Sequence, residues 1–102
     1  MTRFVLIHHG GKPPGNQEAR DRMMAAMGEW MEGLGDALVD SGSPLGSPRS
    51  IGGEATDPAN GYMILEAADL DTAEQLASAM PMAGEGEARI DVHEALSMED
   101  RT

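Results

Sequence analysis

The stretch of sequence that decides the fold is Gly61-Tyr62-Met63-Ile64-Leu65-Glu66-Ala67, followed by Ala68-Asp69-Leu70-Asp71-Thr72-Ala73-Glu74-Gln75-Leu76-Ala77-Ser78-Ala79-Met80-Pro81. Side chains alternate along its first part, which predicts a strand with Met63, Leu65 and Ala67 on one face. In the second part apolar residues recur at helical spacing, Asp69 or Asp71 can cap the helix, and Pro81 with Gly84 ends it. The stretch therefore predicts a compact strand, turn and helix.

A strand and a helix are also predicted upstream of this unit. Residues 3–9 contain Phe, Val, Leu and Ile in an unbroken run, which predicts a strand buried on both faces, and a glycine- and proline-rich loop follows over 10–15. Asn16 is a candidate N-cap for a helix from Gln17 to about Asp40, ended by Ser41-Gly42. The apolar stripe of this helix consists of Met23, Met27, Trp30, Met31, Leu34 and Leu38.

Two further strands complete the expected architecture. Residues 43–53 are rich in glycine and proline and fit an irregular edge strand, whereas 88–95 alternate as a last strand before a frayed tail over about 96–102. The order strand, helix, strand, strand, helix, strand predicts an α+β fold of the ferredoxin-like βαββαβ type, an antiparallel sheet with two helices on one face. The first strand should lie between the last strand and the 61–67 strand.

Length and composition limit the classes of function. The 102 residues are expected to form a single domain spanning 1–102, and an aromatic content of only 3% favours a core shared in an oligomer. A net charge of -11 argues against nucleic acid and anionic membranes as partners. No cysteine is present, and no signal peptide or membrane-spanning run is evident, so we expect a cytoplasmic protein with no membrane association.

The residues of the deciding stretch also carry a family resemblance. The pattern Gly61, Tyr62, Ile64 and Glu66, then Asp69-Leu70-Asp71-x-Ala73 and Met80-Pro81, resembles the YCII-related (DGPF-type) proteins. Further upstream, Trp30-Met31-x-x-Leu34, Ser41-Gly42, Leu45-Gly46 and Pro48 fit the same pattern, so the resemblance runs from about Trp30 to Glu94. It implies a dimeric α/β barrel, hence a homodimer, with a cleft near the dimer interface.

The resemblance implies no inherited catalytic residues. Most members have no known biochemical function, and one branch resembles a dehydrochlorinase with a His-Asp pair. The corresponding regions here read Arg22-Met23-Met24-Ala25-Ala26, without a histidine, and Ala79-Met80-Pro81, without a carboxylate. The Asp-Gly-Pro-Phe signature is replaced by Asp57-Pro58-Ala59-Asn60.

The best candidates for chemistry are His8 and His9 at the end of the first strand. Adjacent strand residues point to opposite faces, so one histidine should face the helices and the other the open face. Antiparallel pairing brings Tyr62 and Arg89 beside this end, where the group could bind a small anionic or phenolic ligand with a histidine as the base. Alternatively, Arg89 pairs with Asp91, with Glu87 or with a partner subunit.

Other polar and apolar groups have two interpretations each. Glu66, Asp91 and His93 should share the open face, where pairing across an interface is favoured over a metal site because no recognised ligand spacing is present. The methionines and Trp30 of the first helix either form core or line a pliable pocket for an aromatic ligand. We expect no metal and no cofactor.

The sequence therefore leaves three classes of function open. The leading hypothesis is a homodimeric small-molecule-binding protein with a cleft at the dimer interface near His8, His9, Tyr62 and Arg89, with Trp30 as a further ligand contact. The alternative is a cofactor-free enzyme of lyase or isomerase type that acts on a small aromatic or lactone-like substrate with a histidine general base. The third is a structural or regulatory dimer without a ligand.

Overall fold

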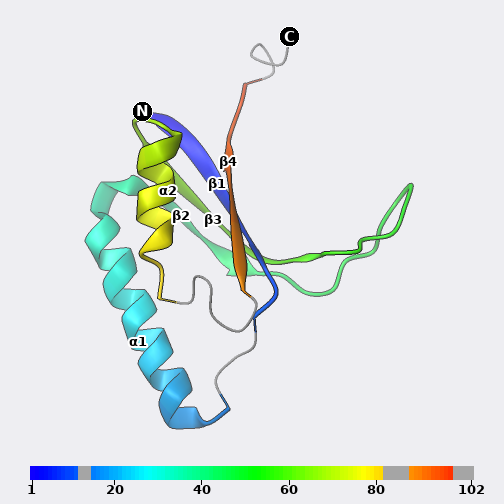
Figure 1. Cartoon of the computed structure of the whole chain (residues 1–102), viewed down its shortest axis with the longest axis horizontal. Helices are drawn as coiled ribbons and strands as arrows, with labels where there is room; N and C mark the ends of the chain where they lie inside the picture. Colours follow the sequence, from blue (N-terminus) through cyan, green and yellow to red (C-terminus); the bar gives the residue numbers. More distant parts are fainter. Residues whose placement is uncertain (12–14, 82–87, 98–102) are drawn as a thin grey trace.

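A four-stranded antiparallel sheet with two helices on one face makes up the fold (Figure 1). The computed structural model describes residues 1–11, 15–81 and 88–97. In chain order the elements are β1 (Thr2–His9), α1 (Gln17–Leu34), the 3₁₀ turn η1 (Gly35–Ala37), β2 (Leu38–Pro44), β3 (Ala59–Ala67), α2 (Leu70–Ser78) and β4 (Arg89–Glu94). The strand order is β2-β3-β1-β4, so the expected ferredoxin-like arrangement and the central position of the first strand are confirmed.

The core lies between the sheet and the two helices. Phe4 and Leu6 of β1 are fully buried, as are the β3 residues that alternate toward the same face, and this confirms the predicted facing of Met63, Leu65 and Ala67. The expectation that β1 is buried on both faces is wrong for the single chain. Val5 and Ile7 point to the uncovered face and are only partly buried, because both helices pack on the other side.

The first helix is shorter than predicted, and the edge strand begins earlier. α1 ends at Leu34, where Gly35 adopts a φ of +55° that few other residues tolerate, and its amide donates to the Glu32 carbonyl. Leu38 is therefore not a helical residue but the first residue of β2, paired with Leu65 of β3. The predicted edge position of this strand is confirmed, but its predicted bounds of 43–53 are wrong, since β2 spans Leu38–Pro44.

Side-chain caps fix the start of each helix. Asn16 Oδ1 accepts from the Ala19 amide at 2.8 Å, and Asp69 Oδ1 accepts from the amide and the hydroxyl of Thr72 at 2.8 and 2.7 Å. These bonds lower the pKa of Asp69, because they stabilise its ionised form. Both predicted caps are thus confirmed, whereas Gly84 and residues 98–102 of the expected tail lie outside the described residues.

A glycine in β2 allows this edge strand to approach β3 closely. Gly42 has a φ of +72°, and its amide donates to Asp40 Oδ1 at 2.8 Å where the pairing register of β2 shifts. A Cβ atom at this position would lie 1.7 Å from the Tyr62 carbonyl oxygen. Only glycine therefore fits, since both the backbone conformation and the space exclude a side chain.

We expect Gly42→Ala to lower the free energy of unfolding by roughly 3 kcal/mol or more, because the methyl group forces β2 away from β3. Gly35→Ala is the matched control: its φ is also positive, but nothing lies within 4 Å of an added Cβ. It should cost about 1–2 kcal/mol, the price of backbone strain alone. Urea denaturation at one fixed protein concentration measures both, and equal losses would contradict the proposed close contact.

Candidate functional site

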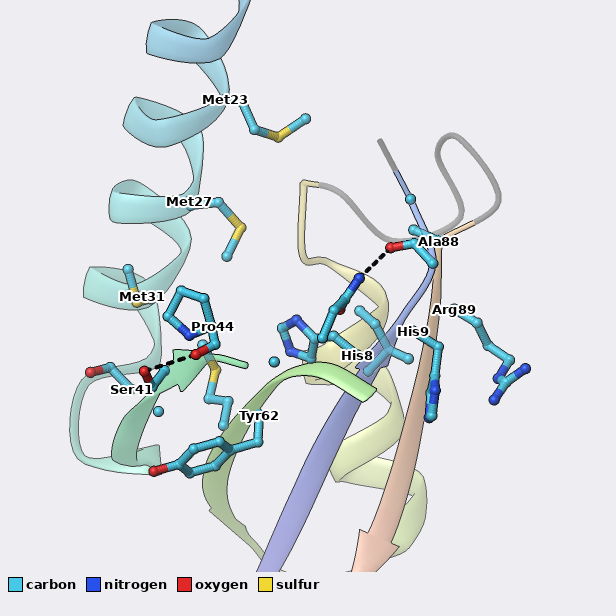
Figure 2. Close-up of a pocket in the computed structure, with 18 of the residues that line it drawn as sticks. His8, His9, Met23, Met27, Met31, Ser41, Pro44, Tyr62, Ala88 and Arg89 are labelled. Carbon is cyan, nitrogen blue, oxygen red and sulfur yellow. Dashed lines mark hydrogen bonds between the residues drawn. The ribbon is translucent and has the colours of Figure 1, made fainter. Parts of the chain in front are cut away.

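A cavity of about 540 Å³ lies between α1 and the end of the sheet where β1 finishes. Its walls come from α1, from the end of β1 together with Gly10 and Gly11, from the end of β2, from the start of β3 and from the start of β4. The cavity is mainly apolar in character. Figure 2 shows side chains from these elements around it. Its volume falls in the range of pockets that hold small organic ligands.

Methionines of α1 form one wall of the cavity. Met23, Met27 and Met31 are spaced four residues apart, so they lie on one face of the helix. In Figure 2 Met23 and Met27 project from the helix toward the sheet. Met24, which also lines the cavity, is 73% exposed and lies at its rim. Thioether side chains are flexible and polarisable, so this wall can adapt to the shape of an apolar ligand.

His8 stands on the opposite wall. It follows Phe4 and Leu6 in the alternation of β1, and therefore points to the face that the helices cover. Its ladder partner on β3 is Gly61, whose missing side chain leaves room beside the imidazole. The ring lies between β1 and the methionines (Figure 2).

The imidazole of His8 is neutral and incompletely bonded. Its Nε2 atom is buried and has no hydrogen-bond partner among the described residues. Burial lowers the pKa of His8, and the neighbouring charge of His9 lowers it further. At neutral pH the wall of the pocket therefore contains an uncharged imidazole whose Nε2 lacks a hydrogen-bond partner among the described residues.

His9 has a different environment, although it is the next residue. It points to the open face of the sheet, where its Nδ1 lies 3.1 Å from the Asp57 carbonyl oxygen and its Nε2 lies 3.3 Å from Asp91 Oδ2. Each ring nitrogen thus has an acceptor oxygen close to it, and the side chain is only 13% exposed. The prediction that the two histidines face opposite sides of the sheet agrees with these positions.

Arg89 completes a charged cluster with His9, Asp57 and Asp91. Its guanidinium binds a carboxylate oxygen of Asp57, and it also bonds Asp91 at 3.1 and 3.2 Å. These bonds raise the pKa of Arg89 and lower the pKa of Asp91, because each favours the charged form of its partner. Arg89 is therefore paired with Asp91, which is one of the pairings that the alternative interpretation of the sequence predicted. Glu87 lies outside the described residues.

Asp57 is the one member of the charged cluster that sequence reasoning missed. It lies in the segment between β2 and β3, and propensity does not predict the path of such a segment. A signal was nevertheless present. Asp57 precedes β3 by two positions, and Ala59 at the start of β3 pairs with His9, so the register places Asp57 beside this histidine.

Of the remaining predicted residues, Tyr62 lies at the cavity, whereas Trp30 and Glu66 do not. Tyr62 lines the cavity, as do His8, His9 and Arg89. Trp30 does not line it: its indole donates to the Leu76 carbonyl at 3.1 Å and packs against the core. Glu66 pairs with Arg3 at 3.5 Å, at the end of the strands away from the cavity. Within the described ranges no group of three or more His, Cys, Asp or Glu could hold a metal ion.

Comparison with known proteins gives one match. The model of the YCII-related domain family matches residues 3–95 of this chain. No curated protein and no solved structure matches it. In the described residues no helix has the length and apolar character needed to cross a membrane.

We expect Arg89→Gln to raise the pKa of Asp91 toward the ordinary aspartate value, since the guanidinium is the largest cause of its lowering. A carboxylate with a lowered pKa in the folded state stabilises the fold above its unfolded pKa, and this stability is lost as pH falls through the folded value. The wild type should therefore lose more stability than Arg89→Gln below about pH 4. Carboxylate titration by NMR measures the pKa directly.

Arg3→Gln is the control for this titration, because Arg3 pairs with Glu66 and is not part of the charged cluster. It should leave the pKa of Asp91 unchanged. An unchanged pKa of Asp91 in Arg89→Gln would show that this ion pair does not exist in solution.

Proposed function

Because this chain belongs to the YCII-related domain family and contains an apolar cavity beside an unpaired histidine, we propose that it is a homodimer that binds a small molecule in this cavity. The observation that carries the proposal is the buried Nε2 of His8, a residue that lines this mainly apolar cavity. Ligand pockets typically combine apolar walls with a few fixed polar groups, and this cavity has that composition.

Binding is favoured over catalysis by the way the two histidines are arranged. A histidine base needs one nitrogen for the substrate and a second that a carboxylate orients. In the described chain His8 has a nitrogen without a partner, but no carboxylate hydrogen-bonds to it. His9 has its carboxylate neighbours, but an acceptor oxygen already lies close to each of its nitrogens. Neither histidine therefore has both features of a general base, as a cofactor-free enzyme would need.

The uncovered face of the sheet carries apolar residues, which favours a homodimer. Val5 and Ile7 of β1 and Ile64 of β3 are apolar residues of this face, and Ile7 lies opposite Tyr62 in the ladder. Packing a second sheet on them would bury apolar surface that the helices leave uncovered. The segment between β2 and β3 also extends away from the helices (Figure 1) and carries a fully exposed Ile51, which a second chain could cover.

The cavity would then lie beside the dimer interface. His9 and Arg89 line the cavity and also form the charged cluster on the uncovered face. A second chain on this face would therefore contact the same residues that border the cavity. This arrangement matches the cleft near the interface that the family resemblance implies.

Ligand binding can be tested with the uncharged fluorescent probe N-phenyl-1-naphthylamine. We expect its fluorescence to rise on addition of the protein and this rise to be lost in Gly61→Leu, because a larger side chain would occupy the space beside His8. Gly61→Ala is the control, since an added Cβ meets only ordinary contacts, with the nearest atoms at 3.6 Å. Equal fluorescence with both variants would place the probe elsewhere on the protein.

Dimer formation can be tested by sedimentation equilibrium. We expect Ile7→Glu to weaken association by at least about tenfold, because a charge would be buried in the interface without a partner. Leu70→Glu is the control: Leu70 is 49% exposed at the start of α2, on the helical side of the molecule. A wild type that remains monomeric at the highest concentration studied would overturn the dimer.

A further inference from the structure

An unpaired nitrogen in the wall of the cavity restricts the chemistry of its ligand. His8 Nε2 is buried without a hydrogen-bond partner among the described residues. Leaving such a polar atom unpaired is unfavourable, and a ligand that supplies the missing hydrogen bond recovers this free energy. An entirely apolar ligand would supply no such hydrogen bond. The ligand should therefore carry one polar group that lies beside this nitrogen.

The charges around the cavity argue against an anionic ligand. Arg89, the cationic residue of the lining, is already bound by the carboxylates of Asp57 and Asp91. The lowered pKa of His8 keeps its imidazole neutral near pH 7. Among the described lining residues, a carboxylate or phosphate entering the cavity would therefore meet no unpaired cation, within a chain of net charge -11.

The walls of the cavity favour an apolar body. Met23, Met27 and Met31 form one side, and Met63 and Ile90 contribute from the sheet. Thioethers make favourable contacts with aromatic rings, and they adapt to rings of different size. The cavity volume of about 540 Å³ accommodates a ring system of two or three fused rings.

We propose that the cavity takes an uncharged, mainly apolar molecule with one hydroxyl group, such as a phenol, whose O–H donates to Nε2 of the neutral His8. This assignment rests on the proposed binding function and specifies its ligand class. The hydroxyl pairs with the one buried side-chain polar atom of the described residues that lacks a partner, and the ring packs against the methionines of α1.

The test is displacement of N-phenyl-1-naphthylamine at pH 7.5 by 1-naphthol, 1-methylnaphthalene and 1-naphthoate. These three probes share one ring system and differ in its substituent. We expect the ratio of the naphthol affinity to the methylnaphthalene affinity to fall about 3- to 10-fold in His8→Phe, because only naphthol loses a hydrogen bond. In the wild type naphthoate should be the weaker binder when compared with naphthol.

His93→Gln is the matched control, because His93 lies opposite Val5 on the uncovered face and does not line the cavity. It should leave the affinity ratio unchanged. A ratio unchanged in His8→Phe, or naphthoate as the tightest binder, would overturn the assigned ligand class while binding itself stands. If neither the fluorescent probe nor any naphthalene binds the wild type, the proposed binding function fails as well.

A second measurement uses only the wild-type protein, so it does not depend on whether a variant folds. In the wild type, naphthol should shift the ¹⁵N resonance of His8 Nε2, whereas methylnaphthalene should shift it much less. Equal shifts with the two probes would contradict a hydrogen bond from the hydroxyl group.

Discussion

Adjacent residues of a β-strand point to opposite faces of its sheet, and this constraint separates the two histidines at the end of β1. His8 is directed toward the helices and borders a mainly apolar cavity, and its buried Nε2 has no partner in the described part of the chain. His9 is directed to the uncovered face, where oxygens of Asp57 and Asp91 lie close to its two nitrogens. The histidine with an unpaired nitrogen, His8, is therefore not the histidine with carboxylate neighbours, His9. This separation favours binding over catalysis.

The cavity itself depends on the pairing register of the sheet. β1 lies between β3 and β4, and its register sets His8 opposite Gly61, the position where β3 has no side chain. Gly42 allows β2 to approach Tyr62 closely, so the end of β2 can form a wall of the same cavity. Glycines thus make space beside the histidine at one position and close contact at another. A register shift of one residue would move His8 to the uncovered face.

Much of the fold could be predicted because local signals and tertiary packing agree. The alternation in β3, the Asp69 cap and the apolar centre of β1 each depend on a few neighbouring residues. The end of α1 was mispredicted because Leu34 and Leu38 continue the helical spacing across Gly35. An apolar run such as that of β1 also cannot show whether the chain itself covers both faces of a strand.

The candidate site was predictable only in part. Strand alternation and antiparallel register are enough to bring His8, His9, Tyr62 and Arg89 to one end of the sheet. Trp30 fits the same apolar stripe as the methionines, but its indole donates to the Leu76 carbonyl of α2, whereas the next residue, Met31, lines the cavity. Sequence spacing gives the face of a helix, not the neighbour that each turn meets.

The most direct measurement is a crystal structure of the protein with 1-naphthol bound. We expect the naphthol oxygen within hydrogen-bond distance of His8 Nε2, about 3 Å, and its rings against Met27 and Met31. Naphthol on the uncovered face of the sheet, or inside the cavity with its oxygen directed away from His8, would contradict it.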